Sequence, residues 1–325
     1  MNLIERNSDV LQRRHGLIDT EFLSKLLSIE LGREIQQTTR IMDGLGSVCF
    51  EMSTKNARYF VKCRIFSDHQ PLCRELLFCF LAPKIGICAP KVIKADCSRT
   101  VFSYEYGIFE YLEIETARLI WLQMTRECKQ TFARRVAAEV AKLHQASIEV
   151  SGFGRIAEQA IGSSYQLRFK GEDRTLGSFL GTYLPKSIDC RLDYIELLLS
   201  YGAQFNNSVI CHGDLNLRNI LYSKFPHELY LIDSNLSICF RELDLADLVA
   251  SIFITENLDT KSAYLAIVRM VVDAYIKECN CKINTDVLAI LVNVAAFRKM
   301  ETALKLGRDD AFGYECLFKI ASDGW

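Results

Sequence analysis

The sequence predicts an α+β protein of two lobes: an N-terminal lobe (residues 1–112) with an antiparallel sheet and a helix, and a mainly helical C-terminal lobe (residues 113–325). Three observations support this prediction. The chain has 325 residues, which exceeds the roughly 150 residues of an average domain. Short segments with strand-like patterns, separated by turn residues, dominate up to position 112. From Arg118 onward, apolar residues recur chiefly at helical spacing.

The N-terminal lobe is expected to open with an amphipathic helix over residues 19–31. Apolar residues recur there every three or four positions from Phe22 to Leu31. Asp19 or Thr20 precedes the first apolar position and can cap the first turn. This segment therefore predicts a helix with one buried face.

Six short segments after this helix are typical of strands, because turn residues separate them. A second helix, over residues 71–78, is expected after the third strand. The loop between the first two strands contains Gly44 and Gly46. The predicted strands are residues 37–41, 48–53, 59–64, 91–95, 101–104 and 107–112.

The C-terminal lobe contains six segments with a helical pattern. The first has a face of small alanine side chains, which suits close packing, and it carries His144. For this histidine we favour a structural hydrogen bond near the helix end over a general-base role. The predicted helices are residues 132–148, 176–184, 190–205, 242–254, 260–277 and 286–306.

Composition argues against several classes of protein. Apolar residues make up 50% of the chain and only five residues are proline, so the whole chain is expected to fold. The net charge is −1 and no dense run of Lys or Arg occurs, which argues against nucleic acid and anionic membrane as partners. The longest apolar stretch, near residues 287–297, contains Asn293 and is too short to span a bilayer.

The 13 cysteines are scattered from Cys49 to Cys316 without a Cys-x-x-Cys pair. Cys279 and Cys281 form the one close pair in the sequence. Charged residues interrupt the start of the chain, so no signal-peptide core is expected. We therefore expect reduced, mostly buried thiols in a soluble, cytoplasmic protein.

The most informative stretch is residues 209–221, Val-Ile-Cys-His-Gly-Asp-Leu-Asn-Leu-Arg-Asn-Ile-Leu. It places Asp214 and Asn219 on one short loop after an apolar strand, and Asp233 follows a second apolar strand. A carboxylate at the first position can accept a proton from an attacking hydroxyl. Asn219 and Asp233 offer the hard oxygen ligands that Mg²⁺ bound to a triphosphate requires. This spacing of Asp, Asn and Asp is typical of a phosphotransfer site.

These residues also resemble a known family, the aminoglycoside phosphotransferases and choline kinase-like proteins. Three motifs occur in that family's order: His-Gly-Asp-Leu-x-x-x-Asn-Ile-Leu from His212 to Leu221, then Ile232-Asp233, then Asp-Leu-Ala from Asp244. The resemblance implies a two-lobed protein kinase-like fold. It also implies transfer of the γ-phosphate of ATP, bound with Mg²⁺, to a hydroxyl of a small molecule.

The resemblance implies roles for the residues of the C-terminal lobe. Asp214 would orient and deprotonate the acceptor hydroxyl, while His212 would buttress the catalytic loop by hydrogen bonding. Asn219 and Asp233 would bind magnesium. Asp244 is expected to cap its helix and to hold the catalytic loop by hydrogen bonds.

In the N-terminal lobe, the resemblance implies that Lys62 holds the α- and β-phosphates and that Glu75 on the following helix fixes this lysine. Gly44 and Gly46 would let their loop lie close over the phosphates, and Ser47 would donate a hydrogen bond from its backbone or hydroxyl. Each feature alone also fits a bland interpretation: a hairpin turn, a solvent-facing lysine or a solvated helix face.

The end of the last predicted strand resembles the hinge of this family. Backbone groups around Glu110 to Leu112 would hold the adenine edge. Because backbone recognition leaves little trace in side chains, the choice between ATP and GTP stays open.

Two positions depart from the usual family pattern. Ser234 and Asn235 follow Asp233 where many relatives carry an aromatic residue and a second acid, and Asn216 stands where His is common. These changes bear more on the identity of the acceptor, which stays open, than on the phosphotransfer reaction.

The acceptor classes that the resemblance implies are an aminoglycoside, an amino alcohol or a sugar-like compound. An antibiotic-modifying enzyme is the first interpretation, and a metabolic kinase of the choline, homoserine or fructosamine type follows. A non-catalytic nucleotide-binding protein is the alternative from another class, and the oligomeric state stays open. A protein kinase fits less well, since His-Arg-Asp, Asp-Phe-Gly and Ala-Pro-Glu are absent.

Several acids of the helical region can line a cleft for a polycationic acceptor, although a solvated helix face suits each of them better. None is assigned to the substrate. These residues are Glu242, Asp247, Glu256, Asp259, Glu301, Asp309 and Asp310.

Overall fold

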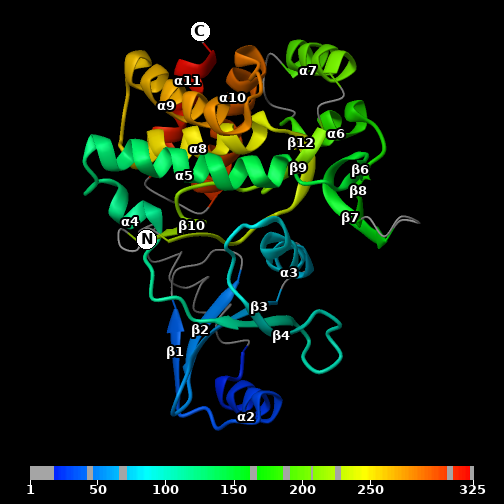
Figure 1. Cartoon of the computed structure of the whole chain (residues 1–325), viewed down its shortest axis with the longest axis vertical. Helices are drawn as coiled ribbons and strands as arrows, with labels where there is room; N and C mark the ends of the chain where they lie inside the picture. Colours follow the sequence, from blue (N-terminus) through cyan, green and yellow to red (C-terminus); the bar gives the residue numbers. More distant parts are fainter. Residues whose placement is uncertain are drawn as a thin grey trace. The chain divides into compact units, whose positions relative to one another are not determined.

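A computed structural model of the chain describes residues 18–41, 47–65, 72–161, 167–185, 191–205, 208–223, 228–305 and 310–322. The chain divides into two compact units (Figure 1). Unit 1 comprises Met1–Leu81 and Ala89–Glu113, and unit 2 comprises Ala82–Cys88 and Ile114–Trp325. An antiparallel sheet in the first unit and a mostly helical second unit confirm the predicted α+β fold class.

Unit 1 is built on a five-stranded antiparallel sheet in the order β1-β2-β3-β5-β4. Five of the six predicted strands are thereby confirmed. Two helices of this unit, α2 (Thr20–Leu31) and α3 (Leu72–Leu81), were also expected. The strands are β1 (Gln37–Ile41), β2 (Val48–Ser53), β3 (Arg58–Arg64), β4 (Val92–Asp96) and β5 (Glu105–Glu110).

The predicted strand at residues 101–104 is wrong. This segment forms bends before β5 begins at Glu105. Its aromatic residues stack on one another, with the rings of Phe102 and Tyr104 4.6 Å apart. Both rings belong to the core of unit 1. Burial of a bend therefore produced the apolar pattern that the sequence shares with a strand.

The alternation along β3 gives the sheet of unit 1 two different faces. Val61 and Cys63 pack with Leu23 and Leu27 of α2 in one hydrophobic core. Side chains alternate across a strand, so Lys62 lies on the opposite face. Asp19 caps α2 as expected, since its Oδ1 accepts hydrogen bonds from the first backbone N–H groups of the helix.

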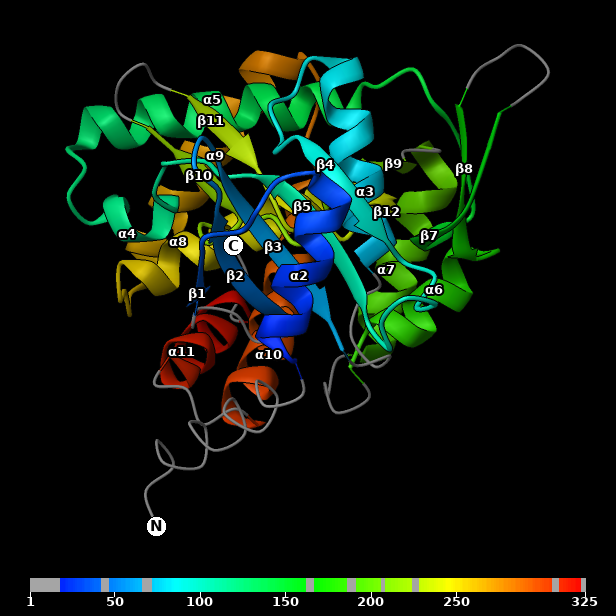
Figure 2. The same ribbon diagram turned by 90° about the horizontal axis from the view of Figure 1, so that it is seen from below.

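Unit 2 contains more sheet than the sequence indicated. A five-stranded sheet has the order β6-β8-β7-β12-β9, and β10 pairs with β11. β7 and β8 form a long antiparallel hairpin (Figure 2). The strands are β6 (Glu149–Ser151), β7 (Phe153–Ile161), β8 (Leu167–Asp173), β9 (Ser208–Cys211), β10 (Ile220–Tyr222), β11 (Leu229–Leu231) and β12 (Ser237–Phe240).

The helices of unit 2 confirm all six predicted helical segments, with shifted ends. The predicted helix at residues 132–148 begins earlier and ends at His144, before β6. α5 packs against α9, and α8 packs against α9 and α10. The helices are α4 (Ala117–Trp121), α5 (Arg126–His144), α6 (Leu176–Tyr183), α7 (Arg191–Phe205), α8 (Glu242–Thr255), α9 (Lys261–Cys279), α10 (Thr285–Lys305) and α11 (Ala311–Ser322).

None of the helices in the described ranges combines the length and the apolar character needed to cross a bilayer.

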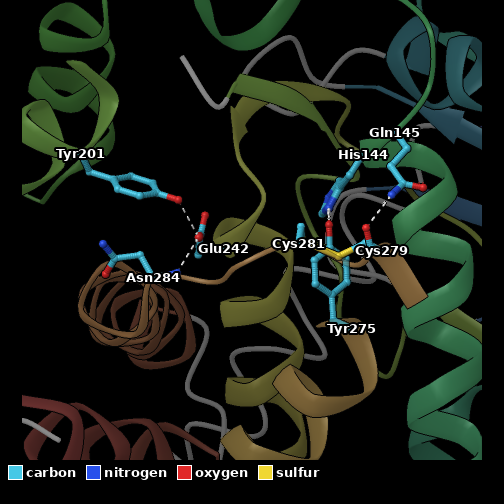
Figure 3. Close-up of a disulfide and its surroundings, with 8 residues drawn as sticks. All are labelled: His144, Gln145, Tyr201, Glu242, Tyr275, Cys279, Cys281 and Asn284. Atoms are coloured by element: carbon cyan, nitrogen blue, oxygen red, sulfur yellow. Dashed lines mark hydrogen bonds between the residues drawn. A yellow bond between two sulfur atoms is a disulfide. The ribbon is translucent and has the colours of Figure 1, made fainter. Parts of the chain in front are cut away.

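The prediction of reduced thiols is wrong for one pair. Cys279 and Cys281 form a disulfide at the end of α9 (Figure 3). Asn280 between them is the C-cap of α9 in a left-handed conformation, with φ 49°. This turn brings the two flanking Cα atoms to 5.4 Å, within the range of a disulfide. Ten other cysteines among the described residues are not in a disulfide, and five of these are buried: Cys49, Cys63, Cys79, Cys211 and Cys239.

Candidate active site

The loop between β9 and β10 carries the predicted catalytic residues. It begins at His212, and Gly213 then adopts φ 78°. A Cβ added at Gly213 would lie 2.2 Å from the backbone oxygen of Asn235. Glycine is therefore required twice, for the backbone conformation and for the close approach of the segment after β11. This turn exposes the next residue, Asp214, whose side chain is 43% accessible.

Three side chains hold the carboxylate of Asp214. Its Oδ1 accepts hydrogen bonds from Asn216 Nδ2 at 2.9 Å and from Lys299 Nζ at 3.2 Å. Its Oδ2 accepts one from Asn219 Nδ2 at 3.0 Å. The carboxylate is thus fixed in orientation while part of it stays accessible, as a group that receives a proton from a bound hydroxyl requires.

The structure brings the two predicted metal ligands together through the backbone. The N–H of Ile232 donates to the carbonyl of Asn219 at 3.0 Å, which places Asp233 beside Asn219. Asp233 adopts φ 54°, a left-handed conformation in which aspartate is enriched among residues with a side chain. Asn219 itself is 7% exposed.

The donor set fits a magnesium ion. The Asn219 amide nitrogen is bonded to the Asp214 backbone and carboxylate, which leaves its oxygen as the ligand atom. Within the described residues, the buried Oδ1 of Asn235 has no hydrogen-bond partner. Together with the Asp233 carboxylate, these are hard oxygen donors of the kind that Mg²⁺ prefers.

Asp244 anchors the catalytic loop from the first turn of α8. Its Oδ2 accepts from the backbone N–H of His212 at 2.7 Å, and its Oδ1 accepts from that of Gly213 at 2.9 Å. The loop-holding role is confirmed, whereas the expected cap role is wrong. The N-cap of α8 is Arg241, and Asp244 lies three residues further on with its side chain turned to the loop.

Asp244 is completely buried. Burial alone would raise its pKa, but the hydrogen bonds from His144 and from the Gly213 N–H act in the opposite direction and outweigh it. The pKa of Asp244 is therefore lowered. A carboxylate that stays ionised in this position is a strong acceptor for the two loop amides.

A second layer of contacts supports Asp244. His144, at the end of α5, bonds Asp244 through Nε2 at 3.1 Å and Tyr275 through Nδ1 at 2.7 Å. The neighbouring Gln145 donates to the carbonyl of Cys279 at 3.0 Å (Figure 3). The structural role expected for His144 is thus confirmed, and this layer joins the ends of α5 and α9 to the catalytic loop.

His212 lies fully inside unit 2. Its carbonyl accepts hydrogen bonds from the Asn235 N–H at 2.8 Å and the Ser234 hydroxyl at 2.9 Å. Burial lowers the pKa of its imidazole, although nearby carboxylates act in the opposite direction. A neutral ring inside the core suits the predicted buttress and not a proton carrier.

In unit 1, Lys62 of β3 forms a buried ion pair with Glu75 of α3, as predicted. Lys62 Nζ lies 2.6 Å from Glu75 Oε2, and the two residues are 5% and 6% exposed. Arg64, on the same face of the strand, lies 3.8 Å from the same oxygen. At Gly107, opposite Lys62 in β5, an added Cβ would lie 2.8 Å from the Phe109 ring, so this neighbour of Lys62 must stay small.

The predicted loop over the phosphates is described in part. Gly44 and Gly46 lie outside the described residues. Ser47, the first residue after that gap, has a buried hydroxyl oxygen with no hydrogen-bond partner in the described part of the chain. Buried hydroxyls are normally bonded, so this oxygen is available to a bound ligand.

The predicted adenine hinge changes in one detail. The backbone N–H of Glu110 already donates to the carbonyl of Lys91 at 3.0 Å, and the Glu110 carboxylate accepts from the Lys91 N–H. Leu112 lies beyond the last residue of β5. Recognition of an adenine edge would therefore fall on backbone groups after Glu110.

Sequence reasoning missed two basic residues, one beside Glu75 in unit 1 and one beside Asp214 in unit 2. Arg64 was detectable, because it follows Lys62 at a spacing of two and must share its face of the strand. Lys299 left no local sign, since it lies on α10, 85 positions after Asp214, in a helix predicted from its apolar residues alone.

Replacing Gly213 by Ala should lower the free energy of unfolding by about 2 kcal/mol or more, because the new Cβ meets both the left-handed φ and the Asn235 carbonyl. Urea denaturation measures this. Gly181→Ala is the matched control, since nothing lies within 4 Å of a Cβ at that helical position. Equal stability of the two variants would contradict the account of the loop.

Comparison with known proteins gives one family match. A model of a family described as the phosphotransferase enzyme family matches residues 55–260. This span includes Lys62, Glu75 and the whole catalytic loop. No curated protein matches the chain.

Solved structures show where the fold recurs. A thermostable mutant of the aminoglycoside phosphotransferase APH(4)-Ia aligns with a TM-score of 0.62 and 15% identity, covering 93% of this chain and 99% of that one. A variant of the same enzyme in ternary complex with ADP and hygromycin B aligns with a TM-score of 0.59 and 15% identity, covering 93% and 98%. A structure from Haemophilus somnus 129PT, named for fructosamine-3-kinase, aligns with a TM-score of 0.61 and 15% identity, covering 92% and 96%. At such identities the likeness concerns the fold.

Proposed function

This chain belongs to the phosphotransferase enzyme family, and we propose that it is an ATP-dependent small-molecule kinase that moves the γ-phosphate to a hydroxyl of its acceptor. The observation that carries the proposal is the Asp214 carboxylate. It is partly accessible, and Asn216, Asn219 and Lys299 fix its orientation. A carboxylate held in this way can receive the acceptor's proton.

The residues of unit 2 would act in a fixed division of roles. Asp214 orients the acceptor hydroxyl and takes its proton as the new phosphate ester forms. Asn219 and Asp233 would hold Mg²⁺, which would neutralise the negative charge of the phosphates. Asp244 keeps the loop in register through the His212 and Gly213 amides.

The residues of unit 1 would serve the nucleotide. Lys62 contacts the α- and β-phosphates, and Glu75 keeps its ammonium in place through the 2.6 Å ion pair. The Ser47 hydroxyl adds a donor for a phosphate oxygen. ATP is the proposed nucleotide, with GTP as the alternative, and use of ATP fits a cytoplasmic location.

For the acceptor, the proposal is an aminoglycoside-like, amino-alcohol or sugar-like compound. Similar folds include an enzyme in complex with hygromycin B and a protein named for fructosamine-3-kinase, at nearly equal TM-scores. Antibiotic modification and a metabolic role are therefore both open within this proposal. The pairing of Lys62 with Glu75 and the fixed Asp214 favour a catalyst over a non-catalytic nucleotide-binding protein.

The test is release of ADP from Mg²⁺-ATP by the purified protein, measured against a panel of aminoglycosides, macrolides, amino alcohols and sugars. We expect at least one acceptor to raise ADP release, and Asp214→Ala to abolish the increase. If nucleotide binds but no acceptor raises ADP release, the kinase proposal fails and the nucleotide-binding alternative takes its place.

Lys62→Met should lower kcat/KM for Mg²⁺-ATP by roughly 10²-fold, because a phosphate contact is lost and Glu75 is left buried without its ammonium. Initial rates at varied ATP measure the effect. Lys55→Met, at an exposed turn of the same unit, is the matched control. Equal kinetics in the two variants would remove Lys62 from the proposed site.

A further inference from the structure

A lysine of α10 lies against the proposed catalytic carboxylate. Lys299 Nζ is 3.2 Å from Asp214 Oδ1 and 3.4 Å from Asp247 Oδ1. The Lys299 side chain is 23% exposed and that of Asp247 is 12% exposed. One ammonium therefore bridges two carboxylates, one from the catalytic loop and one from α8, and all three residues belong to unit 2.

The charges of this group are tightly linked. Burial by itself would lower the pKa of Lys299, but the carboxylates of Asp247 and Asp214 raise it above its usual range. Burial raises the pKa of Asp247 to about 6, against the opposing effect of the Lys299 charge. Lys299 is thus held as a cation, and it pairs with both the proposed catalytic carboxylate of Asp214 and the carboxylate of Asp247.

The acids considered for a polycationic acceptor mostly serve other partners inside unit 2. Asp309 lies outside the described residues. Four others have internal donors or cations within hydrogen-bond or ion-pair distance. These are Glu242 with Tyr201 and Asn284, Glu256 with Lys129 and Trp121, Asp310 with Arg218, and Asp247 with Lys299.

The geometry of an ammonium gives Lys299 a further donor. Its nitrogen carries three N–H groups, of which Asp214, by a hydrogen bond, and Asp247, at ion-pair distance, take up two at most. The third can donate to an oxygen on the acceptor atom next to the reacting hydroxyl. A neighbouring hydroxyl can accept this bond, whereas a neighbouring ammonium cannot accept it and is repelled by the like charge.

We infer that Lys299 determines acceptor specificity in the proposed reaction. Its ammonium is already the cation beside Asp214, so a second ammonium on the acceptor is disfavoured there. The site therefore selects acceptors that carry a neutral oxygen next to the reacting hydroxyl. The acceptor is then a vicinal diol, such as a sugar or other polyol. This inference rests on the proposed function and narrows its acceptor class.

The first test compares matched acceptors that differ in one group: ethylene glycol with 2-aminoethanol, and glycerol with 2-amino-1,3-propanediol. We expect kcat/KM of the wild type to favour the diol by roughly tenfold or more. Lys299→Met should shift this ratio toward the amino compound by a similar factor, because two carboxylates then lack a cation. Lys261→Met, an exposed lysine on α9, should leave the ratio unchanged. Equal use of both acceptors by the wild type, or an unchanged ratio in Lys299→Met, would overturn the inference.

A second arm needs no turnover and separates this inference from the proposed function. Lys299→Ala leaves Asp214 and Asp247 without the ammonium, so ethylammonium should raise its melting temperature, while tetramethylammonium, which has no N–H, should not. Wild-type protein should respond to neither. If the variant shows no selective response to ethylammonium, the inference is overturned even where the kinase proposal stands. If it responds while no acceptor is phosphorylated, the kinase proposal fails and the cation position stands.

Discussion

Asp214→Asn should lower kcat for phosphoryl transfer by about 10²- to 10⁴-fold, with a smaller effect on the KM for ATP. The amide cannot take the proton of the acceptor hydroxyl, and it places an N–H₂ group where Asn216, Asn219 and Lys299 now donate. Nucleotide binding should persist, because Lys62 and Glu75 lie in unit 1. Steady-state rates at saturating ATP and acceptor measure the effect.

The control for this variant is Asp273→Asn, the same change at an exposed position on α9. It should keep the wild-type kcat. A loss of less than about fivefold in Asp214→Asn would be too small for a general base and would contradict its assignment.

The second large effect concerns stability. Asp244→Ala should lower the free energy of unfolding by about 3–5 kcal/mol, because it leaves the backbone N–H groups of His212 and Gly213 without their acceptor and removes the partner of His144. Urea denaturation followed by circular dichroism measures the change. If Asp244→Ala does not accumulate as folded protein, Asp244→Asn provides the milder form of the same loss.

Asp273→Ala is the matched control and should lie within about 0.5 kcal/mol of the wild type, since the residue is exposed. If Asp244→Ala loses no more stability than Asp273→Ala, the catalytic loop does not depend on Asp244.

The lowered pKa of Asp244 also sets the sign of a pH effect. A carboxyl group whose pKa falls on folding adds stability above its unfolded pKa, near 3.8, and this stability is lost as the pH drops through the folded value. The difference in unfolding free energy between wild type and Asp244→Asn should therefore stay constant above about pH 5 and narrow below pH 3.8. A difference that widens on acidification would contradict the lowered pKa.

Local patterns explain what could be predicted from the sequence. The alternation placed Lys62 on a strand and Glu75 on the next helix, and the family resemblance implied that the two side chains pair. The same holds for the catalytic loop, where Asp214 and Asn219 are five positions apart and Gly213 makes the turn. Here sequence spacing translates directly into space.

The rest depends on tertiary contacts that no local pattern encodes. Residues 101–104 resemble a strand because Phe102 and Tyr104 are buried, yet their stacking belongs to a bend. α5 ends at His144, and β6 and then the hairpin of β7 and β8 follow it. The apolar pattern does not show where this helix ends. Lys299 reaches Asp214 only because α10 packs against α8.

The most direct measurement of the central claim is ³¹P NMR of a reaction containing the wild-type protein, Mg²⁺-ATP and the acceptor that gives the highest rate of ADP release. We expect one phosphate monoester resonance that grows in step with ADP and that grows at least about 10²-fold more slowly when Asp214 is replaced by Asn. If only the inorganic phosphate signal grows, or if no ATP is consumed, transfer of the γ-phosphate to a hydroxyl is contradicted.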